Sequence, residues 1–463
     1  MSSLEKNNSS AGAEKGAINA RSAALEALKE VEEREAYLNL VLNRFLSGNS
    51  LSDAERSLFT ELAYGVMQRR NTLDWVLSLY LNRPMEKLTI WIRNILRMGV
   101  YQLLYLPRIP DSAAVDEAVK LASRYGHRGV AGLVNAVLRK VSGAKGSLPW
   151  PSREENPVLY LSLRHSYPIW MVERWMENLG FEETEAFCAA GNMVPPLTVR
   201  TNTLRLSKTE LKHRLEIEGV GAGDCVYAPE GLHLKLNKRL VELESFREGL
   251  FQVQGESSML VAPLLNPQPG EAVLDLCSAP GGKTVHLGML MQNQGSIVAT
   301  DLYPKRLKLV RDAAHRQGID IINTEKLDGR SVDPDKEGAF QRVLADVPCS
   351  GLGVIRRKGD LKWRRRPEDI LSLAELQLQL LKGAYKYLCR GGVLLYSACT
   401  TEPEETTGVL EKFLAAEPSA RPVMLSPLLP EKLKGEEQRA GMICLWPHKH
   451  NLDGFFLARI RKK

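Results

Sequence analysis

Residues 273–284 read Val-Leu-Asp-Leu-Cys-Ser-Ala-Pro-Gly-Gly-Lys-Thr, and this stretch decides the fold of the chain. Its first four residues predict a short buried strand, and the glycine pair lets the backbone approach a ligand closely. A P-loop would need glycine where Cys277 stands, and the Gly-x-Gly-x-x-Gly fingerprint of dinucleotide-binding proteins is absent. The stretch therefore predicts a strand, a ligand-binding turn and a helix, without either phosphate-binding signature.

The segment from residue 249 onward alternates apolar strands with helical stretches, which is typical of a doubly wound α/β domain. Further strands are predicted at residues 297–300, 325–327, 342–345 and 393–396, with a closing antiparallel pair at 442–446 and 455–460. A helix is predicted over residues 302–317, closed by Gly318. Because the carboxyl ends of parallel strands share one edge of a sheet, residues that follow these strands are expected to converge on one site.

Acids and cysteines follow the predicted strands. Asp301, Asp328 and Asp346 close the second, third and fourth strands. Such acids suit an adenosyl ligand with hydroxyls, an exocyclic amine and an ammonium group, and S-adenosylmethionine has all three. Cys349 and Cys399 also leave strand ends, so two thiols are expected to face one pocket. A thiolate is well suited to attack an electron-poor ring carbon, and the sequence therefore predicts chemistry on a pyrimidine.

The bulk composition is that of a soluble globular protein. The chain has 463 residues, 44% hydrophobic and 25% charged, and we find no apolar run long enough to span a bilayer. Its seven cysteines include no Cys-x-x-Cys pair, so neither a zinc ribbon nor a disulfide framework is favoured. We therefore expect no bound metal and a reducing, cytoplasmic setting. The net charge of +7 favours attraction to polyanions.

A basic run lies shortly after Cys349. Residues 356–366 contain seven basic side chains and one acid, with Trp363 among them. A charge run is often only a solvated loop, but its position beside the predicted site favours contact with RNA phosphates. The residues predicted to bind RNA are Arg356, Arg357, Lys358, Lys362, Arg364, Arg365 and Arg366.

Three segments precede the α/β domain. Residues 1–16 are predicted to be a flexible tail, and residues 17–143 a helical bundle with a capped helix start at Ser52. A linker follows, and residues 158–242 mix helices and strands in a small α+β domain.

The helical segment resembles the NusB family of RNA-binding antitermination factors. The resemblance is carried by residues 20–25, 56–66, 95–103 and 132–139. It implies an all-α RNA-binding domain, although a helical scaffold that only packs on its neighbour remains an alternative.

Residues 249–463 resemble the cytosine-5 RNA methyltransferases of the NOL1/NOP2/Sun family. The matching motifs are residues 275–283, 346–351, 396–400 and 453–456, and Ser278 stands where the family often has alanine. The resemblance implies a Rossmann-like class I methyltransferase domain that binds S-adenosylmethionine. The cofactor-binding residues it implies are Cys277, Ser278, Ala279, Pro280, Gly281, Gly282, Lys283, Asp301, Asp328 and Asp346. With the NusB-like segment in front, the whole chain resembles bacterial members that methylate 16S rRNA, expected at cytosine 967.

The same resemblance implies a role for each cysteine. It makes Cys399 the nucleophile that adds to C6 of the cytosine, Asp346 a partner of the ring nitrogen N3, and Cys349 the group that assists product release. The Pro-Cys motif of DNA methyltransferases would instead nominate Cys349, and spacing alone does not decide. Residues 400–404 predict a helix start, which would place Cys399 just before a helix N-terminus. Lys283 is expected to orient either the cofactor loop or the ring.

Other functions stay open at this point. The substrate could be tRNA or 23S rRNA, or the chain could be a non-catalytic RNA-binding assembly factor that uses only its NusB-like domain. Methylation of amino groups is disfavoured because residues 346–349 do not carry the Asn/Asp-Pro-Pro-Tyr motif. A monomer that binds RNA but no membrane is expected.

Overall fold

A computed structural model describes residues 19–48, 51–236, 238–437, 439 and 441–463. The predicted flexible tail, residues 1–16, lies outside the described residues. The chain divides into two compact units. The first holds residues up to Phe181 together with residues 358–360, and the second holds the remainder.

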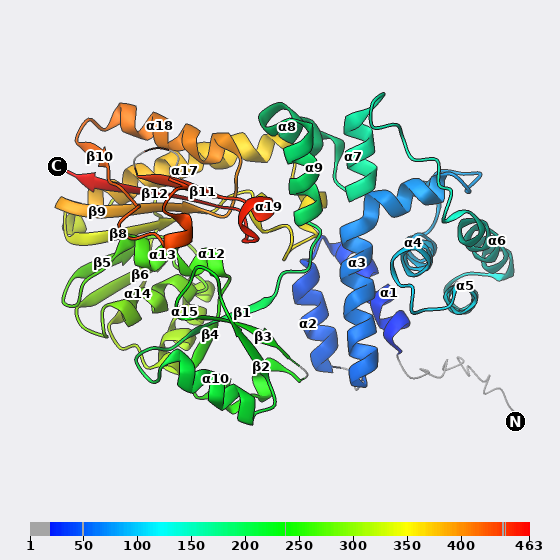
Figure 1. Cartoon of the computed structure of the whole chain (residues 1–463), viewed down its shortest axis with the longest axis horizontal. Coiled ribbons are helices and arrows are strands. Elements are labelled where there is room, and N and C mark those ends of the chain that lie inside the picture. Colours follow the sequence, from blue (N-terminus) through cyan, green and yellow to red (C-terminus); the bar gives the residue numbers. More distant parts are fainter. Residues whose placement is uncertain (1–18, 49–50, 237, 438, 440) are drawn as a thin grey trace, which may run out of the picture. The chain divides into compact units, whose positions relative to one another are not determined.

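The first unit is built from helices, as predicted (Figure 1). Its helices are α1 (Ala20–Arg34), α2 (Leu38–Gly48), α3 (Asp53–Ser78), α4 (Ile90–Tyr105), α5 (Asp111–Tyr125), α6 (Arg128–Ala144), α7 (Pro157–His165) and α8 (Ile169–Leu179). Ser52 caps α3 through a capping box with Glu55, which satisfies backbone donors at the helix start.

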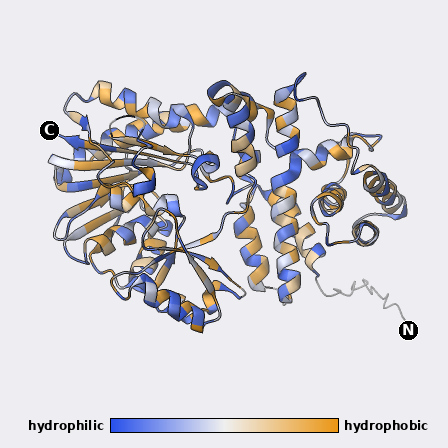
Figure 2. Cartoon of the chain, in the orientation of Figure 1, coloured by the Kyte–Doolittle hydropathy of each residue, from blue (hydrophilic) through white to orange (hydrophobic). Residues whose placement is uncertain are grey.

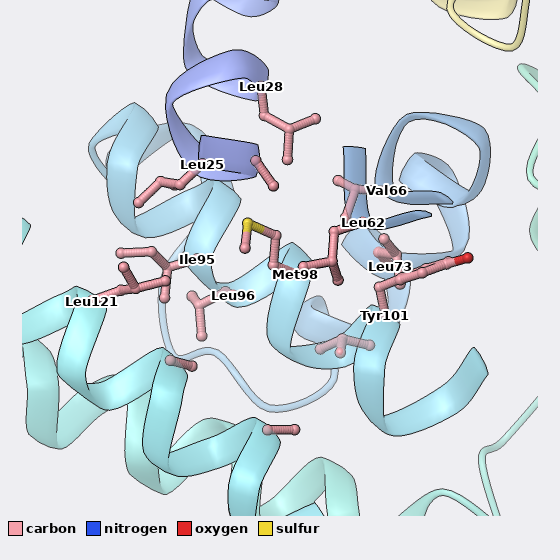
Figure 3. Packing of buried hydrophobic residues seen from close by; sticks show 14 of the residues in the cluster. Leu25, Leu28, Leu62, Val66, Leu73, Ile95, Leu96, Met98, Tyr101 and Leu121 are labelled. Atoms are coloured by element: carbon pink, nitrogen blue, oxygen red, sulfur yellow. The ribbon is translucent and has the colours of Figure 1, made fainter. Parts of the chain in front are cut away.

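Leucines from several helices meet in one core within this unit. Figure 3 shows Leu25, Leu62 and Leu96 in this core, on α1, α3 and α4, with Met98 among them, and the three leucines are fully buried. Gly65 allows α3 and α4 to approach closely, because a Cβ there would lie 2.0 Å from the ring of Tyr101. Apolar burial of this extent is the main stabilising contribution to such a bundle.

The second unit begins with α9 (Phe181–Ala190), whose residues from Glu182 belong to it, and a small antiparallel sheet. Among the described residues this sheet has four strands in the order β2-β3-β1-β4. The strands are β1 (Leu197–Thr201), β2 (Gly221–Asp224), β3 (Gly231–Lys235) and β4 (Phe251–Val253). Helix α10 (Lys208–Ile217) packs on it through Leu211 and Leu215, and α11 (Glu244–Arg247) follows. The prediction of an α+β segment is confirmed.

The larger sheet of the second unit has eight strands among the described residues, in the order β10-β12-β9-β8-β5-β6-β7, with β11 paired to β12. Strands β7, β6, β5, β8 and β9 run parallel, and β10, β11 and β12 join by antiparallel pairing. Their bounds are β5 (Ala272–Asp275), β6 (Ser296–Asp301), β7 (Ile322–Lys326), β8 (Phe340–Asp346), β9 (Leu388–Ala398), β10 (Ala420–Pro422), β11 (Met442–Leu445) and β12 (Phe455–Lys462).

Helices cover both faces of this sheet (Figure 1). Helices α17 (Pro367–Tyr387) and α18 (Thr407–Ala416) pack on the face that carries Leu274 and Val343. Helices α13 (Val261–Leu265) and α14 (Gly282–Leu290) pack on the face that carries their neighbours Val273 and Leu344. Side chains of adjacent strand residues point to opposite faces, so these continuous apolar runs are buried on both sides.

The remaining helices complete the layers. They are α12 (Glu256–Met259), α15 (Pro304–Gln317), α16 (Leu361–Arg364) and α19 (Pro447–His450). Gly318 ends α15 in the left-handed conformation, as predicted. The surface helices carry hydrophilic residues on one side and hydrophobic residues on the other (Figure 2). The predicted α/β class with a Rossmann-like sheet is therefore confirmed.

Two local expectations differ from the structure. The third parallel strand ends at Lys326, whereas the sequence placed it at residues 325–327. Strands β11 and β12 pair as predicted, but α19 lies between them, so their connection is longer than a tight turn. Within the described residues, no helix combines the length and apolar character that a membrane crossing needs.

Candidate active site

The candidate site lies where the order of the larger sheet changes direction. Strand β5 pairs with β6 on one side and with β8 on the other. The segments that follow β5 and β8 lead to helices on opposite faces. In open α/β sheets, ligands bind at the carboxyl ends of strands that part in this way. The loop after β5 and the loops after β8 and β9 all leave this edge, so the predicted residues are brought to one end of the sheet.

The loop after β5 is fixed by its own backbone and by a neighbouring strand. Ser278 donates from its amide and its hydroxyl to the carbonyl of Thr300, at 2.8 Å and 2.9 Å. Gly281 has a φ of +103°, and a Cβ there would lie 2.8 Å from the backbone of Val310. At Gly282, by contrast, a Cβ would have no atom within 4 Å, so the space beside the start of α14 is open.

Buried charges of the small sheet hold the start of α14. Arg200 of β1 is fully buried and donates to the carbonyl of Gly282 at 2.9 Å and to the side chain of Gln254. His286 of α14 lies 3.2 Å from Glu230. Burial lowers the pKa of Arg200 to about 9 and that of His286 to about 4. Sequence reasoning missed this contact, because no local pattern marks a buried arginine on one domain that binds a carbonyl of another.

The three predicted strand-end acids differ in their surroundings. Asp301 is buried, accepts from the amide of Tyr303 and pairs with Arg306 at 2.9 Å. Asp328 is partly exposed, and hydrogen bonds from Arg330 lower its pKa.

Asp346 is held from two sides. It accepts from Ser397 at 2.6 Å and pairs with the Nζ of Lys283 at 2.5 Å. Lys283 in turn lies 4.9 Å from the ring centre of Phe455. The last residues of β8 and β9 and the first turn of α14 thus converge on one carboxylate.

A fourth acid, Asp275, is buried at the end of β5. Its Oδ2 accepts from Thr284 at 2.7 Å, while its Oδ1 has no hydrogen-bond partner. Burial raises the pKa of Asp275 to about 7, and the nearby carboxylates of Asp346 and Asp301 add to this effect. Asp275 lies within the predicted cofactor loop, but its burial at the strand end is not evident from the sequence.

The two cysteines meet because of the register between their strands. Asp346 of β8 is the register partner of Ser397 of β9. Cys349 and Cys399 follow these partners by three and two residues, and their Sγ atoms lie 3.0 Å apart. The contact with Cys399, together with burial, raises the pKa of Cys349 well above that of an ordinary thiol. Cys349 therefore holds its proton in this arrangement.

A buried carboxylate joins the two cysteine loops. Glu405 is 0% exposed and accepts from the amide of Ser350 at 2.8 Å, from Gln377 at 2.9 Å and from the hydroxyl of Thr400 at 3.1 Å. Ser350 follows Cys349, and Thr400 follows Cys399. The Glu405 side chain therefore binds the residue next to each thiol and holds the two loops together. Glu405 was not predicted, because it lies outside the cysteine motifs.

The predicted helix directly after Cys399 is wrong. Residues 400–402 form a loop, Pro403–Glu405 is a single 3-10 turn, and α18 begins only at Thr407. The hydroxyl of Thr400 bonds to Glu405 instead of capping a helix. A helix N-terminus is therefore not what would favour a thiolate at Cys399.

Most of the predicted RNA-binding run serves internal contacts. Lys362 is 0% exposed and donates to Asn192 at 2.8 Å, and Arg356 is buried against the carbonyl of Leu452. These two side chains lack the exposure that phosphate contact needs, so the prediction is corrected for them. The reason is that a dense basic run can be drawn inward by carbonyl and amide acceptors that sequence does not reveal.

The other members of the run are distributed between internal and exposed positions. Arg357 pairs with Asp453 at 2.6 Å. Arg365 donates to the carbonyls of Ser350 and Cys349, at 2.7 Å and 3.1 Å, and so supports the first cysteine loop. Arg364 is half-buried, while Lys358 and Arg366 are exposed.

Comparisons with known proteins agree with this architecture. Residues 262–461 match the family model of the 16S rRNA methyltransferase RsmB/F, residues 18–143 match the NusB family, and residues 167–240 match the ferredoxin-like domain of RsmF/B-like methyltransferases. The chain is 39% identical to the probable ribosomal RNA small subunit methyltransferase B of Bacillus subtilis, over 96% of this chain and 98% of that protein. The chain belongs to the ribosomal RNA small subunit methyltransferase B family.

Other relatives and solved structures extend this finding. The probable small subunit methyltransferase B of Synechocystis is 36% identical over 96% of this chain and 100% of its own length. The crystal structure of PH0851 matches with a TM-score of 0.78 and 28% identity, covering 97% of this chain and all of that one. A methyltransferase homologue from Pyrococcus horikoshii matches with a TM-score of 0.56 and 30% identity, covering 66% and 99% of the two chains.

Asp275 should make stability depend on pH. Its pKa is about 7 in the folded protein and 3.8 as the unperturbed value, so the folded state keeps a proton that the unfolded state releases. The free energy of unfolding should therefore fall as pH rises from about 4 to 7, by at most ~1.4 kcal/mol per pH unit. In urea unfolding across this range, Asp275→Asn should not show this fall in the free energy of unfolding. Asp335→Asn, at an exposed site, should retain the wild-type slope, and equal slopes for all three proteins would refute the assignment.

Removing Glu405 should loosen both cysteine loops. Glu405→Ala leaves the buried donors of Ser350 and Gln377 without their acceptor, so we expect the free energy of unfolding to fall by about 2–4 kcal/mol. Glu405→Gln keeps one acceptor oxygen and should lose less. The control Glu411→Ala removes only an exposed ion pair with Arg439 and should change stability little. Denaturant titration measures these differences, and similar losses at 405 and 411 would contradict the bridging role.

Proposed function

We propose that this chain transfers the methyl group of S-adenosylmethionine to C5 of a cytosine in 16S rRNA, through a covalent bond between Cys399 and C6. Membership of the family supports methylation of rRNA as the activity. The observation that carries the finer proposal is the meeting of two thiols, 3.0 Å apart, beside the Lys283–Asp346 ion pair. Neither an amino-group methyltransferase nor a plain RNA-binding factor needs such a pair.

The residues around β5 and β6 suit S-adenosylmethionine. Space beside Gly282 admits a ligand against the start of α14. Asp301 stands at the end of β6, where a carboxylate can accept from ribose hydroxyls. The Oδ1 of Asp275, which has no hydrogen-bond partner, adds a polar atom within the loop that a ligand could contact. When bound, the cofactor supplies an electrophilic methyl group; residues 277–283 would hold it, with Asp301 and Asp346, while the exposure of Asp328 makes its part the weakest of the set.

Addition to C6 is what makes C5 reactive. Cytosine C5 is a poor nucleophile, but a thiolate that adds at C6 converts the ring to an enamine. We assign this thiolate to Cys399, as the resemblance to the two-cysteine RNA methyltransferases implies. Asp346 is held at the end of β8, where its carboxyl group can interact with N3 of the ring as the charge develops.

The second cysteine is suited to the release step. After methyl transfer, the proton on C5 must leave, its electron pair forms the C5–C6 double bond, and the C6–S bond breaks. The hydrogen bond with Cys399 is the main cause of the raised pKa of Cys349. Once the sulfur of Cys399 is bonded to carbon, it no longer carries the charge that makes this hydrogen bond strong. Adduct formation would therefore lower the pKa of Cys349 and allow it to act as a base or to assist one.

Recognition of the RNA is proposed for the helical unit and for exposed basic residues. The match to the NusB family covers residues 18–143, and Lys358 and Arg366 remain exposed in the basic run. A stacked cytosine would have to be flipped out, since attack at C6 needs an exposed ring face. Among the RNA substrates considered, the names of the family and its relatives favour 16S rRNA over tRNA or 23S rRNA.

A methylation assay tests this proposal. The purified protein, given labelled S-adenosylmethionine, should methylate 16S rRNA, and bisulfite sequencing should locate the product at a single cytosine, expected at position 967. 23S rRNA and tRNA serve as matched RNA controls. Label in 23S rRNA or tRNA alone would overturn the 16S assignment. Failure to bind S-adenosylmethionine would instead support a non-catalytic assembly factor.

Single substitutions of the two cysteines should separate their roles. We expect Cys399→Ala to abolish both methyl transfer and any covalent adduct with RNA. Cys349→Ala should form the adduct but release it slowly, so a protein–RNA band should accumulate on a denaturing gel. Cys389→Ala, a cysteine away from the two loops, should behave as the wild type. An adduct that requires Cys349 and survives in Cys399→Ala would reverse the assignment.

A further inference from the structure

Three potential metal ligands meet at the small sheet, outside the site described above. Cys225 follows β2, His233 lies in β3 and Glu256 begins α12. The Sγ of Cys225 is 3.9 Å from Nδ1 of His233, and Nε2 of His233 is 3.9 Å from Oε2 of Glu256. One donor atom from each residue lies within 4.8 Å of the others. The cluster thus joins a hairpin of the small sheet to the first helix after it.

We propose that Cys225, His233 and Glu256 bind a zinc ion, with water in the fourth position. Thiolate, imidazole and carboxylate are the donors that zinc accepts in proteins. Bond lengths of about 2.3 Å to sulfur and 2.0–2.1 Å to nitrogen place two tetrahedral ligands about 3.5 Å apart. His233 can give the ion only one nitrogen: Nε2 faces Glu256 at 3.9 Å, whereas the 3.9 Å contact with Cys225 is made by Nδ1. One donor atom from each residue lies within 4.8 Å of the others, so the side chains must move inward by about 1 Å to complete a tetrahedral site.

The surrounding contacts orient the ligands. Glu256 is 5% exposed, and its Oε1 accepts from the backbone amides of Tyr227 and Ala228, which leaves Oε2 turned toward His233. The hydroxyl of Thr198 lies 3.3 Å from Nδ1 of His233. Outer contacts of this kind fix ligating carboxylates and imidazoles in metal sites.

Close packing also places the thiol. A Cβ at Gly231 would lie 2.7 Å from the Sγ of Cys225, so glycine at the start of β3 makes room for the sulfur. His233 and Cys225 are half-buried, which gives an ion a route from solvent.

The charge balance favours a cation over hydrogen bonding alone. Among the described residues, Glu256 has no lysine or arginine as an ion-pair partner. Glu230 adds negative charge near Cys225, whereas the charge of Asp224 is offset by its ion pairs with Lys208 and Lys212. A buried carboxylate without a cation is costly, and zinc would supply one. Binding would release one proton, since the Cys225 thiol must become a thiolate to coordinate the ion.

No metal was expected from the sequence, because the chain has no closely spaced cysteine pair. Here the three ligands come from residues 225, 233 and 256, and only the β2–β3 pairing and the turn into α12 bring them together. The expected effect of the ion is structural: it would tie the small sheet to the larger domain next to the Arg200 contact with the cofactor loop. This proposal does not depend on the methyl-transfer chemistry.

Zinc content of the full-length protein without an affinity tag tests the proposal. After zinc loading and gel filtration, the wild type should retain about one zinc per chain, whereas Cys225→Ala and His233→Ala should retain close to none. Two controls should bind as much zinc as the wild type: Cys389→Ala, on β9, and His213→Ala, at an exposed position of α10. A wild type that retains no zinc would overturn the proposal. So would equal retention by Cys225→Ala, because the ion would then be held elsewhere, for example by Cys349 and Cys399.

Cobalt binding and thermal unfolding separate loss of the site from loss of the fold. Cobalt(II) should give the wild type a thiolate-to-metal absorption band that Cys225→Ala lacks, while its circular dichroism stays that of the wild type. A chelator should lower the unfolding temperature of the wild type and leave that of Cys225→Ala unchanged. A chelator effect of the same size on both proteins, or a cobalt band that persists without Cys225, would refute the assignment.

Discussion

The parallel pairing of β8 with β9 is the constraint on which the rest of the site depends. Because Asp346 and Ser397 are register partners, the chain leaves the two strands side by side, and the cysteines that follow arrive at the same place. A slip of one residue would turn every side chain of a strand to the other face and separate the thiols. The apolar runs on both strands resist such a slip, since Val343, Leu344, Leu394 and Leu395 are all fully buried. The packing of the core thus determines where the two thiols lie.

Buried polar groups then complete what the strands begin. Loops beyond a sheet edge lack the hydrogen bonds that pair neighbouring strands. Glu405 and Arg365 compensate by binding backbone groups next to the thiols. Arg200 does the same for the cofactor loop from another domain. In a low-dielectric interior each of these bonds is strong, and each would be costly to leave unmade. The loops of the candidate site are thus fixed by these bonds, and the proposed reaction needs such fixed loops to align the cofactor with the ring.

Sequence patterns predicted the elements that rest on apolar burial, and they failed where buried charge decides the structure. Strands β5, β6, β8 and β9 were found because their apolar runs are continuous, and the cysteines were found because they follow such runs. Glu405 and Arg200 carry charges that a pattern assigns to the surface, yet both are fully buried. Lys362 was misread for the same reason. The supposed helix after Cys399 shows a related limit, because the acids of residues 402–405 resemble a helix start while one of them is needed as a buried acceptor.

The contacts of Lys283 bear on whether this lysine acts on the cofactor loop or on the ring. Both oxygens of Asp346 already have donors: Ser397 binds Oδ1, and the Nζ of Lys283 binds Oδ2. A ring nitrogen that contacts Asp346 must therefore share or replace one of them. Ser397 lies in the central strand β9 and has little freedom to withdraw, whereas Lys283 has a long flexible stem. If a cytosine contacts Asp346 as proposed, the lysine is therefore the donor that can withdraw to make room for it, and the serine is not. Because Lys283 belongs to the first turn of α14, such a movement would also reach the loop proposed to hold the cofactor, so the proposal couples binding of the base to binding of the cofactor through one side chain.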